Sequence, residues 1–276
     1  MDIILDLTDE SILTPYVYPE SLSPKNIWRQ LCSLTILVIL GGYALYLITA
    51  AVNYYLFFDK RLLQHPQSLK DQVKQEISCS TRAIPLMSFL SVLMFLAEIR
   101  GYSKLFDSFD ETRLGKWSIP LYSASFIFFT DSLIYWIHRG LHSRFFYKNL
   151  HKQHHKWKVP TPFASHAFHP IDGFVQSFPY HLYVFLFPMH KWTYLALFVF
   201  VNVWTVSIHD GNYKVPMRLK EIINGAAHHM DHHLFYNYNY GQFFTFWDRV
   251  GGSYRNPSSF EGNGPLKDIE EKEKRT

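Results

Sequence analysis

Cysteine and charged residues are both scarce in this sequence, and each scarcity excludes a class of protein. Only Cys32 and Cys79 are present among 276 residues, so we expect no disulfide scaffold and no structural zinc site built from thiolates. Charged residues make up 18% of the chain, against about a quarter in soluble domains. The net charge of +4 is too small to indicate a nucleic-acid-binding protein. The chain also has no Asn-x-Ser/Thr glycosylation acceptor, since Asn256 is followed by proline.

Aromatic residues, by contrast, reach 18%, and the apolar residues gather in blocks. Residues 31–58 contain no ionised side chain and exceed the roughly 20 apolar residues that span a bilayer. Further apolar blocks cover residues 83–97, which are few for a full crossing, and residues 117–137. Residues 173–208 are apolar on both sides of a turn, which is typical of a hairpin that returns to the same membrane side. We therefore expect an all-α polytopic membrane protein with about four transmembrane helices.

The distribution of lysine and arginine predicts how these helices are oriented. Residues 59–82 and 139–158 are rich in basic side chains, which favours the cytosolic side, whereas residues 1–30 are acidic and are expected in the lumen. The chain then divides into four parts. These are the luminal segment 1–30, three transmembrane helices with their loops at 31–137, a histidine-rich region at 138–260 that includes the hairpin 173–208, and a polar, unfolded tail at 261–276. Residues 138–165 and 209–260 would form a cytosolic helical cap.

Three groups of histidines stand out in the second half of the chain. On a helix, residues three or four positions apart share one face, so each group can present its imidazoles together. Neutral imidazole suits first-row transition metals, and eight such ligands exceed the needs of one ion. Zinc has no redox chemistry, whereas iron can activate dioxygen, so the pattern favours two iron ions. The predicted ligands are His138, His142, His151, His154, His155, His229, His232 and His233.

The sequence also indicates roles for several residues near these groups. His209 follows the last apolar block and His228 precedes the last group, and both are possible ligands. Asp131 lies two helical turns before His138 on the same face, and we expect it to orient a ligating imidazole. His166 and His169 are assigned to the substrate entrance or its loop rather than to the metals, and His65, His181 and His190 to ordinary hydrogen bonding. The basic run at 139–158 suits either anionic lipid or an acidic electron carrier.

The spacings H-x-x-x-H, H-x-x-H-H and H-H-x-x-H-H, divided by an apolar hairpin, resemble the fatty acid hydroxylase and sterol desaturase superfamily of membrane di-iron enzymes. The phrases HKQHHKWKVPTPFASHAFHPIDGF, SIHDGN and AAHHMDHH are similar to its sterol C5-desaturase branch. The resemblance implies iron ligands at the eight positions given above and extends the last group to His228. Where the family often has a histidine after the first group, this chain has Ser143.

The resemblance also implies an activity and a location. The enzyme would introduce the C5–C6 double bond into a Δ7-sterol during sterol biosynthesis, using dioxygen and electrons from cytochrome b5 and its NADH-dependent reductase. It would lie in the endoplasmic reticulum membrane with its active site facing the cytosol, and Lys272-Glu-Lys274-Arg-Thr is similar to a retrieval signal. Two alternatives stay open, namely a sterol C4-methyl oxidase or lipid hydroxylase with the same centre, and a non-enzymatic membrane protein that binds or transports metal.

Overall fold

The computed structural model describes residues 1–211, 216 and 218–274, and the regular elements in this part of the chain are almost all helical. One short parallel pair, β1 (Leu105–Phe106) with β2 (Met189–His190), joins two loops. The α-helices are α1 (Asp2–Thr8), α2 (Ile27–Leu56), α3 (Gln72–Ala97), α4 (Ser118–Leu141), α5 (Arg144–Phe146), α6 (Pro170–Leu186), α7 (Lys191–Ser207), α8 (Ala226–Phe235), α9 (Phe246–Val250) and α10 (Pro265–Glu273).

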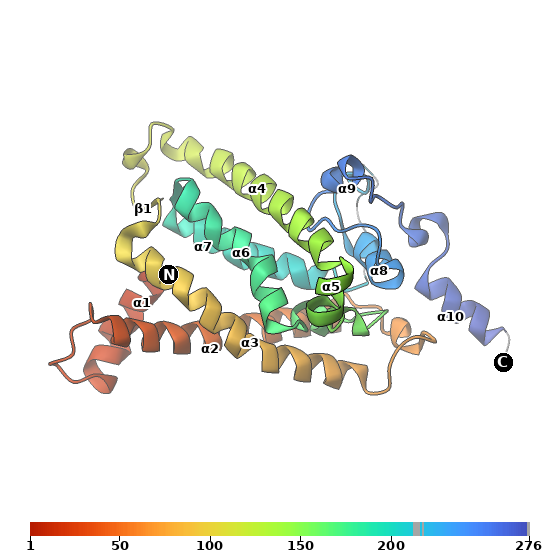
Figure 1. The fold of residues 1–276 in the computed structure, drawn as a ribbon, viewed down its shortest axis with the longest axis horizontal. Coiled ribbons are helices and arrows are strands. Elements are labelled where there is room, and N and C mark those ends of the chain that lie inside the picture. Colours follow the sequence, from red (N-terminus) through yellow and green to blue (C-terminus); the bar gives the residue numbers. More distant parts are fainter. Residues whose placement is uncertain (212–215, 217, 275–276) are drawn as a thin grey trace.

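The long helices form a bundle, and the short helices of the chain's second half gather at one end of it (Figure 1). Helix α2 packs along α3, and α6 lies between α3 and α4. Buried aromatic and aliphatic side chains, among them Phe126 and Tyr183, fill the contact between α4, α6 and α7. Helices α8, α9 and α10 lie at the end where α4 finishes, so the bundle brings all three histidine groups to one place (Figure 1).

Two of the described helices are long and apolar enough to cross a membrane, and they cover residues 27–56 and 72–102. Large apolar side chains of α2 remain exposed, including Ile36, Leu40 and Ile48, as expected for a helix that faces lipid. Helices α6 and α7 have 17 residues each, or about 26 Å, which is less than the about 30 Å of a hydrocarbon core. The count of four spans therefore stays a prediction.

The second membrane helix is much longer than the block at 83–97 indicated. Helix α3 already begins at Gln72, inside a stretch that the sequence analysis treated as a loop. Its first turns are polar, yet Gln72, Glu76 and Ser80 are buried because they bond to a cap segment at 159–163. Gln72 Nε2 donates to the Val159 carbonyl at 2.8 Å, and Ser80 Oγ donates to the Phe163 carbonyl at 3.1 Å. Hydropathy missed this part of the helix because its buried face is hydrogen-bonded rather than apolar.

The prediction of an unfolded tail is wrong for residues 265–273, which form α10. Ile269 is buried there, and Leu266 packs against a cluster that includes Phe58, Leu62 and Met230. Two apolar residues on one face therefore hold an otherwise charged helix against the loop after α2. The last two residues of the retrieval-like signal lie outside the described residues.

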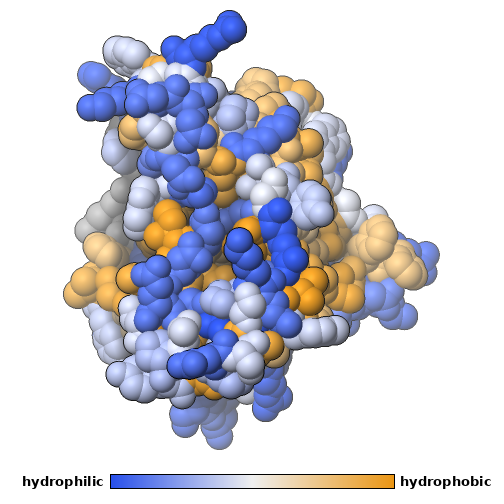
Figure 2. Space-filling view, turned by 90° about the vertical axis from the view of Figure 1, so that its left-hand side faces the viewer, coloured by the Kyte–Doolittle hydropathy of each residue, from blue (hydrophilic) through white to orange (hydrophobic). Residues whose placement is uncertain are grey.

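The end of the bundle away from the histidines has a different surface. Hydrophilic side chains cover much of it, with apolar side chains between them and at the margins (Figure 2). Exposed polar residues of the connection between α3 and α4 contribute to this end, among them Lys104, Asp107, Asp110, Arg113 and Lys116. The bundle thus has exposed polar side chains at both ends, and exposed apolar side chains lie on the helices between them.

Candidate metal centre

Four short segments position the histidines of the site. Helix α4 ends with His138 and His142, and α8 carries the last group. The middle group is not on one α-helix as predicted, because residues 144–156 form α5, a π-helical turn (Tyr147–His151) and a 3-10 turn (His154–Lys156). His154 and His155 are adjacent, so their side chains leave the backbone in different directions, and each belongs to a different histidine assembly. His209 lies just beyond the end of α7.

The first assembly, here called the five-histidine group, joins ligands from all three sequence groups. Its Nε2 atoms lie close together, with His138 to His151 at 3.2 Å and His155 to His151 at 3.1 Å. His155 is also 3.2 Å from His142 and 3.1 Å from His232. Four of these residues are buried and His142 is half-buried. Its members are His138, His142, His151, His155 and His232.

The second assembly, the four-histidine group, lies beside the first and consists of His154, His209, His229 and His233. The Nε2 of His229 is 3.0 Å from that of His209 and 3.2 Å from that of His233. All four side chains are buried. Adjacent residues in the chain again divide between the two groups, because His232 belongs to the first and His233 to the second.

The protein backbone fixes which ring nitrogen faces inward. His138 Nδ1 is 2.9 Å from the Tyr240 carbonyl, and the Nδ1 atoms of His209, His232 and His233 lie 2.7–3.0 Å from other carbonyls. A carbonyl only accepts, so each Nδ1 must carry the proton, and a neutral ring then has a bare lone pair at Nε2. Unprotonated nitrogens 3 Å apart repel one another unless a cation lies between them. The donor set therefore fits a transition-metal ion.

The distances and the protonation state fit a transition metal in both groups. Two nitrogens bound to one ion at about 2.1 Å and at right angles to each other are about 3.0 Å apart, which is the spacing seen here. Burial, and then the charge of neighbouring imidazoles, holds the pKa of His154, His155, His229, His232 and His233 well below the usual range. These rings are therefore neutral at physiological pH, as ligation requires.

A carboxylate does orient a ligand, but it is not Asp131. Asp131 Oδ1 accepts the backbone N–H groups of Phe243 and Phe244 at 2.7 and 3.3 Å, and so holds the loop before α9. Asp172, fully buried at the start of α6, places Oδ2 2.8 Å from Nδ1 of His151. The expectation for Asp131 fails because sharing a helix face with His138 does not bring a side chain two turns away into contact. Sequence reasoning missed this role of Asp172, although the residue lies in the phrase HPIDGF.

The remaining histidines have different surroundings. His209 joins the four-histidine group, whereas His228 is outside both groups, packed against the rings of Tyr254 and Phe260. His169 caps α6, since its Nδ1 accepts the N–H of Ile171 at 3.3 Å. His65 lies 3.2 Å from Asp268, and His190 lies 3.0 Å from the Asp107 carbonyl. His65 also accepts the N–H of Gln67 at Nδ1.

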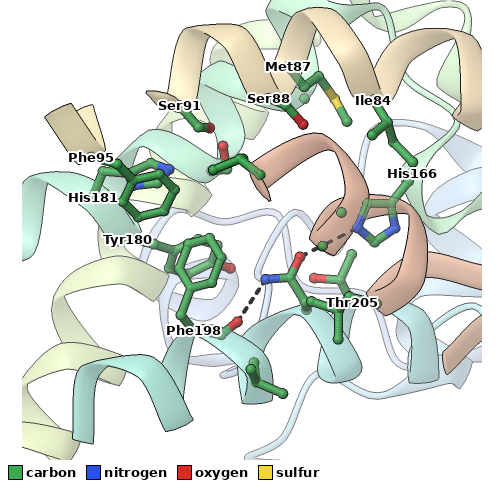
Figure 3. A pocket seen from close by; sticks show the side chains of 18 of the residues that line it. Ile84, Met87, Ser88, Ser91, Phe95, His166, Tyr180, His181, Phe198 and Thr205 are labelled. Atoms are coloured by element: carbon green, nitrogen blue, oxygen red, sulfur yellow. Dashed lines mark hydrogen bonds between the residues drawn. The ribbon is translucent and has the colours of Figure 1, made fainter. Parts of the chain in front are cut away.

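An elongated cavity of about 390 Å³ reaches from the bundle to the histidines, between α2, α3, α6 and α7. Its wall is mostly apolar, as is usual in sites for small molecules of this size. His166 and Thr205 lie toward one end, and His181 and Phe95 toward the other (Figure 3). Phe168, which also lines the cavity, stacks on His154 with the ring centres 4.2 Å apart. The cavity therefore ends against the four-histidine group.

Comparisons with known proteins agree with this architecture. The family model described as fatty acid hydroxylase matches residues 123–253, which include every member of both histidine groups. The chain is 56% identical over 271 residues to a lathosterol oxidase of Homo sapiens, covering 98% of this chain and 91% of the human protein. It is 55% identical to a lathosterol oxidase of Mus musculus, covering 99% and 92%.

The similarity extends to fungi. A Delta(7)-sterol 5(6)-desaturase of Aspergillus fumigatus is 53% identical over 252 residues, covering 89% of this chain and 73% of the fungal protein. No solved structure matches the chain. Because the identity covers 91% and 92% of the two mammalian relatives and 73% of the fungal one, the chain belongs to the fatty acid hydroxylase family.

Proposed function

We propose that this protein is an oxygen-dependent sterol C5-desaturase that converts a Δ7-sterol into a Δ5,7-sterol at a centre of two iron ions. The observation that carries the proposal is the apolar cavity that ends at Phe168, whose ring stacks on His154 of the four-histidine group, with the five-histidine group beside it. The names of relatives 53–56% identical to this chain support the same reaction. Bound iron would supply the activation of dioxygen and the removal of hydrogen from an unactivated carbon.

The residues of the chain provide the ligands, the shape and the exclusion of water. Five imidazoles would hold one ion and four the other, with Asp172 fixing the ring of His151 through Nδ1. Gln176 lines the cavity and donates to Asp172 Oδ1 at 2.8 Å, so the substrate wall and the first group are mechanically connected. The reaction removes one hydrogen from C5 and one from C6. Two external electrons and two protons then complete the reduction of dioxygen to two waters.

The external electrons are proposed to come from cytochrome b5 and its NADH-dependent reductase. The side chains of Arg139, Arg144, Lys148, Lys152 and Lys156 are exposed along the segment that carries the first two sequence groups. A positive surface beside the metals suits an acidic electron carrier. Replacing Lys152 by Glu should slow NADH-driven turnover and weaken its dependence on salt. Lys116→Glu, at the opposite end of the bundle, is the control and should leave the rate unchanged.

The same surface supports the proposed orientation. Basic segments stay on the cytosolic side of a membrane, which would place the histidines at the cytosolic face of the endoplasmic reticulum. Exposed apolar side chains along α2 and α3 would contact lipid. In this arrangement the cap meets the cytosol, and a sterol would reach the cavity from the bilayer between the helices.

The decisive experiment uses microsomes that contain the protein, NADH, oxygen and 5α-cholest-7-en-3β-ol. We expect a conjugated Δ5,7-diene, detected by ultraviolet absorbance and mass spectrometry. His154→Ala should abolish the product, because it removes a member of the four-histidine group. His228→Ala is the matched control, since this buried histidine lies on α8 outside both groups.

Other outcomes would redirect the proposal. A hydroxylated or C4-demethylated product would retain the metal centre and overturn the assigned reaction. Bound metal without an oxygen-dependent product from any sterol would favour a binding or transport protein.

A further inference from the structure

The cavity is elongated and has polar side chains at both ends. Its lining on α7 runs from Tyr194 to Thr205, which corresponds to about 16 Å of helix. Near Leu195 lie His181 Nε2 and the Tyr194 hydroxyl, which are buried and have no hydrogen-bond partner among the described residues. Near Thr205 lie His166, which Figure 3 labels, and Asn202, and the Nε2 of His166 is 3.4 Å from the Oδ1 of Asn202.

The end with Thr205 is the one next to the metal ligands. The Thr205 carbonyl accepts the Nδ1 proton of His209 at 2.7 Å. Phe168, two residues after His166, stacks on His154. A ligand group held by His166 and Asn202 would thus lie at the end of the cavity that contains Phe168, the residue that stacks on His154.

His166 and Asn202 present one donor and one acceptor side by side. Ser165 Oγ lies 3.0 Å from His166 Nδ1, and its hydroxyl can donate there, which leaves the ring proton on Nε2. Burial lowers the pKa of His166 to about 4, so the ring is neutral. Its Nε2 is 3.4 Å from Asn202 Oδ1, at the long limit of a hydrogen bond. Asn202 is itself held in place, since Nδ2 donates to the Phe198 carbonyl at 2.7 Å.

The other polar side chains at this end have shorter bonds. Thr205 Oγ1 donates to the Val201 carbonyl at 2.8 Å and accepts from Gln242 at 2.9 Å. Gln176 is bonded to Asp172. Among the polar side chains at this end, the contact between His166 and Asn202 is therefore the longest and the one that an additional polar group can best replace.

We infer that His166 and Asn202 together bind the 3β-hydroxyl of the sterol, which donates to Asn202 Oδ1 and accepts from His166 Nε2. A hydroxyl is both donor and acceptor, so it replaces one long bond by two short ones. C5 and C6 are two and three bonds from the carbon that carries the hydroxyl. Binding at this end therefore brings the reacting carbons to the metals and directs the sterol side chain toward Phe95 and His181. This inference rests on the proposed function and names the subsite that sets the register of the substrate.

The test measures binding rather than turnover, on iron-loaded protein in lipid nanodiscs. Radiolabelled 5α-cholest-7-en-3β-ol is displaced by the same sterol or by its 3-deoxy analogue, 5α-cholest-7-ene. The wild-type protein should prefer the hydroxylated sterol by about 10-fold to 100-fold, as expected for buried polar groups that lose their partner. Asn202→Leu should remove this preference. His166→Phe, which keeps a ring against Tyr46, should remove it as well.

His181→Leu is the matched control, because it changes a buried polar residue at the far end of the same cavity. It should retain the preference. Loss of the preference in His181→Leu but not in Asn202→Leu would place the hydroxyl at the end of the cavity with His181 and would overturn the inference. A wild-type protein that binds both ligands equally would also overturn it, while the proposed reaction would stand. A wild-type protein that binds neither ligand would overturn the inference and the proposed function together.

Discussion

Replacing Asp172 by Asn should weaken one metal site and leave the other intact. The carboxylate is fully buried, contacts Nδ1 of His151 at 2.8 Å, and has Gln176 as its other partner. The amide has nearly the same shape but no charge. His151 therefore loses a charge-assisted hydrogen bond that fixes its tautomer and makes its Nε2 a stronger donor to metal.

The expected loss of metal affinity follows from the single contact between Asp172 and His151. Loss of a carboxylate partner behind a ligating histidine lowers metal affinity by about 10-fold to 100-fold, or about 1.4 to 2.8 kcal/mol. His151 belongs to the five-histidine group, and no contact links Asp172 to a ligand of the four-histidine group in the described residues. The loss should therefore fall on one ion of the two.

The assay is a chelator titration of the purified, iron-loaded protein, with bound metal counted by mass spectrometry. Wild-type protein should release its ions together at high chelator concentration. The Asp172→Asn protein should release one ion at about 10-fold to 100-fold less chelator and the second ion at the wild-type concentration. Asp131→Asn is the control, because this buried acid bonds to the backbone of Phe243 and Phe244.

The Asp131→Asn control also decides whether Asp131 or Asp172 is the carboxylate that orients a metal-binding histidine. If Asp131→Asn weakened metal binding while Asp172→Asn did not, the carboxylate behind the ligand would be the one that the sequence pattern indicated. Equal loss of both ions in Asp172→Asn would refute the division into two independent groups.

Three further predictions concern the second group, acidity and the tail. His209→Ala should leave one metal per chain, because His209 belongs only to the four-histidine group, and a metal count of two would contradict this membership. The metal-free protein should melt at a lower temperature at pH 5.5 than at pH 7.5. The depressed pKa values of His154 and His233 keep these rings neutral in the folded state, whereas the unfolded chain takes up protons below about pH 6.5; a melting temperature that rises on acidification would show the opposite linkage. Ile269→Asp should destabilise the docked helix α10 by about 2 to 4 kcal/mol, since it buries an unpaired charge. Glu270→Gln, an exposed neighbour, should leave the melting curve unchanged, and equal curves for both variants would show that α10 is not docked.

Hydrophobic blocks and histidine spacing predicted much of this molecule because both depend on local sequence. The apolar run at 31–58 corresponds to α2 at Ile27–Leu56, and the hairpin at 173–208 corresponds to α6 and α7. The pattern failed where a helix is held by polar contacts. The first turns of α3 are buried through Gln72 and Ser80, and these contacts depend on a segment about 80 residues away in the chain.

The division of the histidines into two groups could not be read from their spacing. Shared helix faces predicted that each sequence group acts together, yet His154 and His155 separate, as do His232 and His233. Adjacent residues on a helix point about 100° apart, so each pair divides between the two groups while His151 with His155 and His229 with His233, four residues apart, stay together. His209 could be placed by its position after the last apolar block, but not by a motif.

Sequence motifs carry no information on the backbone groups that take part in the site. The carbonyls of Tyr240, Tyr238, Trp157 and Thr205 accept the outer protons of four ligands. Any residue could supply such a carbonyl, so the side-chain sequence carries no signal for it. What holds these carbonyls in place is the packing of the cap. Asp248 is one example, since its two oxygens accept the N–H groups of Tyr240 and Gly241 at 2.8 Å. An acid that touches no histidine therefore positions the Tyr240 carbonyl and, through it, the ring of His138.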